Sequence, residues 1–203
     1  LSSILAAAVL AAPASGAAPL KGDCLSCHSS LKKRSFAHGP VGVGMCSTCH
    51  TDEKPAKDPP KRHTFSLTKS QPELCLSCHD SMAAALGGFK VPHPAMESGC
   101  TSCHDPHGSE QKFFLKGKTM DAACSACHEA KTKEVVVHKP VGASCALCHE
   151  PHGSANAKLL RSPSPGLCYE CHQKIRRDMA GKHVHAPVKA GCPSCHDPHG
   201  SSK

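Results

Sequence analysis

All the cysteines of this chain stand in one repeated motif. The 203 residues include 16 cysteines, each belongs to a Cys-x-x-Cys pair, and a histidine follows every pair directly. The paired cysteines are Cys24 and Cys27, Cys46 and Cys49, Cys75 and Cys78, Cys100 and Cys103, Cys124 and Cys127, Cys145 and Cys148, Cys168 and Cys171, and Cys192 and Cys195. The histidines that follow them are His28, His50, His79, His104, His128, His149, His172 and His196. Any fold of this chain must accommodate eight copies of this motif.

The motif predicts covalent attachment of haem c, because Cys-x-x-Cys-His is the attachment sequence for this cofactor. The two thiols form thioethers with the two vinyl groups of the porphyrin. The two-residue gap lets one short turn bring both sulfurs to the same edge of the ring, and the adjacent histidine then faces the iron as its proximal ligand. We therefore expect eight covalently bound haems c.

Two other uses of cysteine pairs compete with this interpretation. Eight disulfides, or four zinc sites with four thiolates each, would also use all the cysteines. Neither explains why a histidine follows every pair, and a thioredoxin-like redox site needs one pair only. Haem c accounts for the cysteines and the histidines together.

The composition indicates that the polypeptide does not supply its own core. There are five Phe, one Tyr and no Trp, while Pro (17) and Gly (16) are frequent. Conformational entropy costs about 1–2 kcal/mol per ordered residue and must be offset by burial. We expect the haems to form the core of a mostly irregular, haem-cored chain with short α-helices and little or no β-sheet. Helical patterns follow three motifs, at 80–86, 129–134 and 173–178.

The spacing of the motifs predicts four repeats of two, at about 24–72, 73–121, 122–166 and 167–203, within one octahaem domain (19–203). The second motif of a repeat runs into a Cys-His-x-Pro-His-Gly-Ser turn at 103–109, 148–154 and 195–201. The first repeat is atypical, because a loop rich in Lys and Pro (51–72), carrying His63, replaces this turn.

The first 18 residues have the character of a secretory signal whose start is missing. They are uncharged, with a short apolar run at 4–10 and small residues after Pro13. Pro13 and Gly16 argue against a membrane anchor. Haem c is attached outside the cytoplasm, so we expect an exported protein in the periplasm or at the outer membrane, with an extracellular location as the alternative.

Nine further histidines are candidates for the second, distal ligand of the irons. One set stands seven or eight residues before a second motif: His38, His93, His138 and His185. The other set stands three residues after a proximal histidine and is completed by the displaced His63: His63, His107, His152 and His199. His183 is left over. Three residues are too few to reach the opposite face of the same porphyrin, so the second set should ligate neighbouring haems. The five methionines, which would raise the potential, have no repeated position.

The pattern resembles the doubled Cys-x-x-Cys-His family of multihaem c-type cytochromes over residues 24–200. Less specifically, it is similar to the periplasmic multihaem subunits of outer-membrane porin–cytochrome conduits. The resemblance implies electron relay through the periplasm and outer membrane to extracellular acceptors. It implies redox proteins as donors and acceptors, with an outer-membrane porin and an extracellular cytochrome as partners, or further copies of the chain in a filament.

Two histidines on every iron would leave no position for a substrate, so we expect an electron carrier with no catalytic residues. The alternatives are a subunit of an extracellular cytochrome filament, or a reductase of nitrite, hydroxylamine or a sulfur oxyanion with one open haem, most simply in the atypical first repeat. The net charge of +8 does not indicate nucleic-acid binding, since the lysines are spread along the loops without interleaved aromatic residues. The haem propionates would also bring the oxidised holoprotein close to neutrality.

Overall fold

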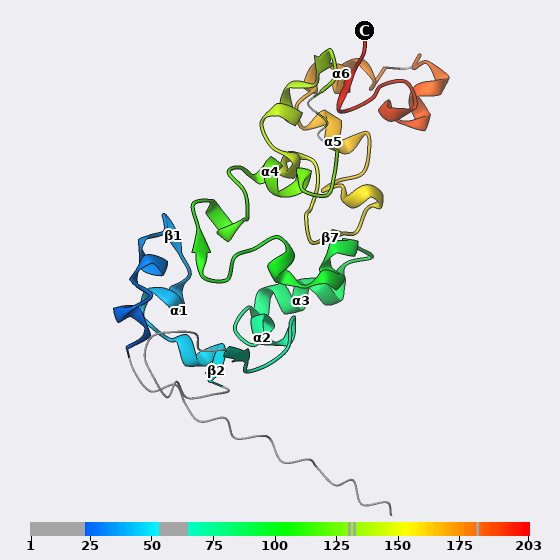
Figure 1. Ribbon diagram of the computed structural model, residues 1–203. Coiled ribbons are helices and arrows are strands. Elements are labelled where there is room, and N and C mark those ends of the chain that lie inside the picture. Colours follow the sequence, from blue (N-terminus) through cyan, green and yellow to red (C-terminus); the bar gives the residue numbers. More distant parts are fainter. Residues whose placement is uncertain (1–22, 53–64, 130, 132, 182) are drawn as a thin grey trace, which may run out of the picture.

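The computed structural model describes residues 23–52, 65–129, 131, 133–181 and 183–203. The predicted secretory segment (1–18) and His63 lie outside these ranges. Figure 1 shows the elements following one another from α1 (Gly39–Gly42), at one end of an elongated molecule, to α6 (Gln173–Asp178) and the C-terminus at the other. Within the described ranges, no helix has the length and apolar character needed to cross a membrane.

The regular elements are short throughout. The other α-helices are α2 (Glu73–Leu76), α3 (Asp80–Gly88), α4 (Met120–Ser125) and α5 (Gly166–Tyr169). The 3-10 helices are η1 (Cys24–Ser26), η2 (Ser29–Lys33), η3 (Cys46–Thr48), η4 (Pro94–Ser98), η5 (Cys100–Ser102), η6 (Lys112–Phe114), η7 (Lys139–Gly142), η8 (Cys145–Leu147), η9 (Ala157–Leu159), η10 (Ala186–Ala190) and η11 (Cys192–Ser194). The strands are β1 (Phe36–Ala37), β2 (His50–Asp52), β3 (Phe65–Leu67), β4 (Val91–Pro92), β5 (Gly108–Ser109), β6 (Val136–Val137), β7 (Gly153–Ser154) and β8 (Gly200–Ser201). The predicted fold class, mostly irregular with short helices and very little sheet, is confirmed.

Each Cys-x-x-Cys-His motif folds as a single helical turn. In seven of the eight motifs, the backbone N–H of the histidine donates to the carbonyl of the first cysteine, with N···O distances of 2.9 to 3.1 Å. Such a bond closes one turn of α-helix. Both thiols and the imidazole are therefore set by one local structure, as haem attachment requires.

Two of the three expected helices are present. The segment 80–86 lies within α3, and 173–178 is α6. The prediction of a helix over 129–134 is wrong: α4 ends at Ser125, and the described residues of this segment are turn, bend or irregular. The β-branched run Val135–Val137 follows directly, and residues of this kind favour the extended conformation that β6 adopts.

Three small antiparallel pairs of strands join successive predicted repeats: β1 pairs with β5, β4 with β7, and β6 with β8. In each, the strand before a histidine of the first distal set pairs with the Gly-Ser of the turn in the next repeat. The pair β2–β3 instead lies within the first repeat, and its register sets His50 opposite Leu67. The sheets therefore serve as joints between neighbouring repeats.

The glycine of the turn is needed because two backbones approach closely at this joint. A Cβ on Gly108, whose φ is +113°, would lie 2.3 Å from the carbonyl oxygen of Phe36. A Cβ on Gly200 would lie 2.5 Å from the carbonyl oxygen of Val136. Neither position has room for a side chain, which explains why Gly follows His in the Pro-His-Gly-Ser turn.

No hydrophobic side chain is buried anywhere in the described part of the chain. Phe113, for example, is 63% exposed. A polypeptide of this size normally buries a contiguous apolar core. The expectation that the core comes from haem rather than from side chains agrees with this observation.

Candidate haem-binding sites

The described residues contain six close pairs of imidazoles, and each pair joins a motif histidine to a candidate distal histidine. The pairs are His79 with His38, His50 with His107, His128 with His93, His104 with His152, His172 with His138, and His149 with His199. Their ring centres are 5.9 to 6.1 Å apart. The interplanar angles are 8° to 20° in five pairs and 34° in the pair of His93 and His128.

This common distance fits one metal ion between the two imidazoles. A bond from a metal ion to an imidazole nitrogen is about 2 Å long, so two imidazoles on opposite sides of one ion have ring centres about 6 Å apart. Six ordinary aromatic contacts would not share one distance so closely, because such contacts range over about 4.5–7 Å. The side chains present therefore fit bis-histidine haem iron.

Hydrogen bonds hold several of these rings by one nitrogen. Nδ1 of His38 lies 2.9 Å from the carbonyl oxygen of Pro106, and Nδ1 of His138 lies 2.8 Å from that of Pro198. An imidazole whose Nδ1–H donates to a carbonyl has Nε2 free to bind a metal, and the bond also fixes the orientation of the ring. These contacts join two repeats, because each carbonyl belongs to the turn of the next one.

The motif histidines of two second motifs are held in the same way from within their own predicted repeat. Nδ1 of His104 lies 2.7 Å from the carbonyl oxygen of Phe113, and Nδ1 of His149 lies 2.9 Å from that of Lys158. Phe113 and Lys158 have φ of +61° and +58°, a left-handed conformation that is costly for residues other than glycine. The strained backbone directs each carbonyl at the imidazole, and strain of this kind is typical of functional sites.

Carboxylates orient two of the turn histidines. Asp105 accepts a hydrogen bond from the backbone N–H of His107 at 3.0 Å, and Asp197 accepts one from that of His199 at 2.9 Å. The same carboxylates lie 3.5 Å and 3.3 Å from the ring Nδ1 atoms. Partial burial alone would raise the pKa of Asp105, but hydrogen bonds from Arg34 and His107 outweigh it and lower that pKa. The hydrogen bond from the backbone N–H of His199 likewise lowers the pKa of Asp197. Both carboxylates are therefore kept ionised beside a ring nitrogen.

Three of the paired imidazoles are biased toward the neutral form. Burial, and next the partner histidine, lowers the pKa of His50, His93 and His152. Neutral imidazole is the form that ligates metal ions. In these three pairs, burial and the partner imidazole therefore favour the protonation state that haem iron requires.

The pairing follows a rule that spans the repeats. A histidine of the first distal set lies beside the first-motif histidine of the next repeat, as His38 lies beside His79. A turn histidine lies beside the second-motif histidine of the preceding repeat, as His107 lies beside His50. Each joint between repeats thus holds one pair in each direction along the chain.

The thiols of successive motifs also lie close enough to interact electrostatically. The pairs are Cys24 with Cys46, Cys49 with Cys78, Cys75 with Cys100, Cys124 with Cys145, Cys148 with Cys171, and Cys168 with Cys192. Burial and then Cys100 raise the pKa of Cys75 to about 11. None of the 16 cysteines is in a disulfide, and the described residues hold no group of three or more ligands of the kind that zinc requires.

The remaining candidates belong to the first and the last predicted repeat. His63 lies outside the described residues. His185 and His196 have no imidazole beside them among the residues that the structure describes, and the same holds for the left-over His183. Both His185 and His196 are exposed, whereas His38, His93 and His138 are half-buried.

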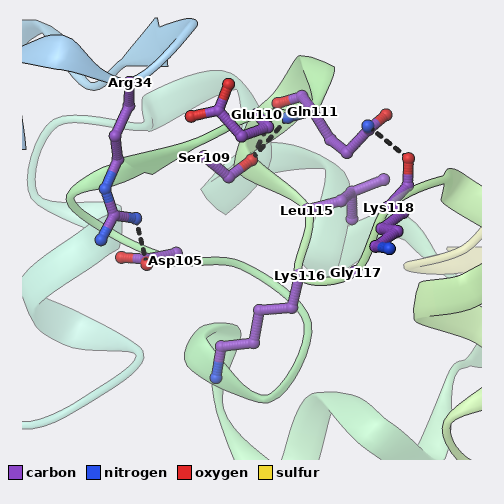
Figure 2. Close-up of a pocket in the computed structure, with 9 residues that line it drawn as sticks. All are labelled: Arg34, Asp105, Ser109, Glu110, Gln111, Leu115, Lys116, Gly117 and Lys118. Atoms are coloured by element: carbon purple, nitrogen blue, oxygen red, sulfur yellow. Dashed lines mark hydrogen bonds and ion pairs between the residues drawn. The ribbon is translucent and has the colours of Figure 1, made fainter.

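A pocket is lined by Arg34 of the first predicted repeat and by residues of the second, among them Asp105 (Figure 2). The guanidinium of Arg34 donates to the carboxylate of Asp105 and to the backbone carbonyl of Gly108. The rest of the pocket is lined by the segment around Gln111 and Lys116. No candidate haem ligand lines the pocket. Arg34 therefore fixes the turn that carries His107.

Sequence reasoning missed these supporting residues. Asp105 and Asp197 occupy the same place in two turns, and this repetition was the available signal. The third turn has Glu150 there. Arg34 carried no such signal, because its partners lie about 70 residues away.

Comparison with known proteins gives two matches. The family model for the doubled CXXCH motif matches residues 38–84, 93–133 and 138–177. Each match begins at a histidine of the first distal set and spans the second motif of one predicted repeat and the first motif of the next. Multiheme cytochrome MtrA of Shewanella baltica (strain OS185) is 36% identical over 155 residues, in an alignment that covers 73% of this chain and 44% of MtrA. The chain therefore spans less than half the length of this relative.

Proposed function

Because the chain belongs to the doubled CXXCH family of multihaem c-type cytochromes, we propose that it carries electrons along a row of eight covalently bound haems c. The motif histidines would be the proximal ligands, and histidines of the neighbouring repeats the distal ones. Haem iron supplies the one-electron chemistry, and the polypeptide holds, orients and insulates it.

The observation that carries this proposal is the shared distance of about 6 Å in six imidazole pairs. An iron with two imidazoles and four porphyrin nitrogens has no open position for a substrate. Electron transfer needs no open position, whereas reduction of nitrite or hydroxylamine does. The pairs therefore favour a carrier over a reductase.

The closeness of successive motifs supports a continuous row. Thiols of neighbouring motifs interact in both halves of the chain, as Cys24 does with Cys46 and Cys168 with Cys192. Each porphyrin is attached through these sulfurs, so the porphyrins of neighbouring motifs would lie edge to edge. Four two-haem repeats, at about 24–72, 73–121, 122–166 and 167–203, would follow one another along the elongated molecule (Figure 1).

The polypeptide would keep each iron in one geometry during electron transfer. Carbonyl oxygens hold Nδ1 of His38, His104, His138 and His149, and carboxylates lie beside Nδ1 of His107 and His199. Rings held in this way cannot rotate freely about the bond to the iron. Little rearrangement would accompany a change in iron charge.

For the cellular route, we propose export to the periplasm and relay toward the outer membrane. Support comes from the likeness to multiheme cytochrome MtrA and from the signal-like character of residues 1–18. The partners would be soluble redox proteins on the donor side, and a porin with an extracellular cytochrome on the acceptor side.

A redox titration of the holoprotein, with intact mass spectrometry, tests the proposal. We expect a mass with eight attached haems and reversible uptake of one electron per haem, with low-spin spectra for the six paired irons. His199→Ala should open the iron of His149 and add one equivalent of carbon monoxide binding to the reduced protein. Fewer than six low-spin haems, or reduction of nitrite or hydroxylamine by the unmodified holoprotein, would overturn the carrier assignment.

A further inference from the structure

The joint between repeats is built from the same contacts wherever it occurs. The strand before a first-set histidine pairs with the Gly-Ser of the next repeat. The backbone N–H of that histidine donates to the carbonyl of the turn histidine: His38 to His107 at 3.4 Å, His93 to His152 at 3.0 Å, and His138 to His199 at 2.9 Å. In two joints the ring Nδ1 also contacts the carbonyl of the turn proline. The turn histidine then lies beside a second-motif imidazole of the receiving repeat.

The fourth repeat contains the receiving half of this joint in the same conformation. His185 precedes a short helix that has proline in its first turn, as His38, His93 and His138 do. The φ and ψ of His185 are −56° and 125°, against −63° and 121° for His138. His183 and Val184 stand where Val136 and Val137 form β6. The sequence and the backbone are therefore those of a joint.

Nothing in the described part of the chain is docked on this receiving half of a joint, which starts at His183. No strand pairs with 183–184, no carbonyl accepts from the N–H of His185, and no imidazole lies beside His185 or His196. The exposure of these side chains agrees with an undocked site. His185 is exposed, while its three equivalents are half-buried. His196 is also exposed, while the second-motif residues His50, His104 and His149 are half-buried. These are the two histidines that the pairing rule would match with a following repeat.

We propose that residues 183–196 form a docking site for the Pro-His-Gly-Ser turn of another doubled-CXXCH cytochrome. The site rests on the bis-histidine function proposed above. The docked turn would add a strand to 183–184, accept from the N–H and Nδ1 of His185, and place its histidine on the haem of His196. In return, the ring of His185 would ligate the first haem of the docked repeat.

A second copy of this chain fits the site poorly. Its three Pro-His-Gly-Ser turns, at 106–109, 151–154 and 198–201, are already docked on the repeats before them. In the first repeat, Asp52 and Glu53 follow the second motif where the turn would have Pro and His. An occupant with a free turn must therefore be a different repeat, which favours extension of the haem row over head-to-tail assembly of identical copies.

A synthetic peptide with the sequence of residues 150–156, which contains one such turn, tests the site on the ferric holoprotein. We expect the holoprotein to contain a high-spin haem, and the double variant Cys192→Ala, Cys195→Ala, which removes the attachment of the haem beside His196, should abolish its signal. The peptide should convert it to a low-spin haem with 1:1 stoichiometry, and should block one equivalent of carbon monoxide binding after reduction. A peptide with alanine in place of its histidine is the control and should leave the high-spin haem unchanged.

Two variants distinguish the contacts made by the side chain of His185 from any effect of the neighbouring His183. His185→Ala should weaken peptide binding at least tenfold while leaving the high-spin haem in place. His183→Ala should change neither, since only the backbone of His183, and not its imidazole, takes part in the proposed contacts. If His183→Ala instead creates the high-spin haem, His183 closes this iron and the proposal is wrong.

The outcomes also distinguish this proposal from the proposed function. If the six paired haems are low-spin but the haem of His196 is low-spin without peptide, or is unaffected by it, only the docking site is refuted. If the six paired haems are themselves high-spin, the bis-histidine function has failed and the docking site fails with it.

Discussion

The imidazoles of His149 and His199, 50 residues apart in the chain, lie 6.1 Å apart with their planes only 8° from parallel. Parallel imidazoles on one iron both donate into the same d orbital, which separates the energies of the two π-type d orbitals. We therefore expect a rhombic low-spin signal from this haem in the electron paramagnetic resonance spectrum of the oxidised protein. His199→Ala should remove it and leave the other signals in place.

The pair of His93 and His128, at 34°, provides an internal comparison. Its signal should be the most axial of the six, and His93→Ala should remove that one. Identical spectra after both substitutions would contradict the assignment of separate orientations to these two haems.

Gly108→Ala should loosen the joint between the first two repeats. The added Cβ would meet the carbonyl oxygen of Phe36 at 2.3 Å, and alanine disfavours a φ of +113°. We expect a loss of about 2 kcal/mol in the free energy of unfolding, measured by chemical denaturation of the holoprotein. Gly142→Ala is the matched control, because a Cβ there has nothing within 4 Å, and it should leave stability unchanged.

Arg34→Ala should destabilise the same joint by a different route. The variant removes hydrogen bonds to the carboxylate of Asp105 and the carbonyl of Gly108. Both side chains of the ion pair are more than two-thirds covered, so we expect a loss of about 1 kcal/mol, again from denaturation. Lys174→Ala, which removes the exposed ion pair with Asp178, should have a smaller effect. Equal effects would show that burial of the Arg34 contact contributes nothing.

His107→Met should raise the potential of one haem. Methionine ligation raises haem potentials relative to bis-histidine, and axial ligands tune haem over roughly 0.8 V. Spectroelectrochemical titration should find one haem shifted upward by a substantial fraction of that range. The matched control is Met96→Leu, since Met96 occupies no position in an imidazole pair. A uniform small shift of all haems would mean that His107 is not an axial ligand.

Much of the fold follows from the motif alone. One helical turn is enough to place both thiols and the histidine, and the lack of large apolar residues leaves haem as the core. The joints were harder to predict, because strands of two residues such as β1 and β5 have no detectable periodicity. The segment after Cys127 shows the same limit: its Lys and Glu suggest a helix, but the extended run that continues into β6 prevails.

The candidate site divides in a similar way. The spacing of the histidines from the motifs divides the candidate distal ligands into two sets. It also shows that His107 is too near His104 in the chain to ligate the same haem. It cannot reveal that His38 lies beside His79 or that His107 lies beside His50, because both contacts depend on how one repeat packs against the next. The strained carbonyls of Phe113 and Lys158 are backbone features, and no residue type marks them.

At each joint, one repeat contributes an imidazole to a motif of the next repeat and receives one for its own second motif. This exchange bears on how long such a chain can be. An internal repeat brings two motifs and two candidate distal histidines. Under the proposed ligation, adding or deleting a whole internal repeat would leave every interior iron supplied and change nothing at the ends. The arrangement therefore imposes no preferred number of repeats, and a longer or shorter chain of this design would transmit charge over a proportionately different span.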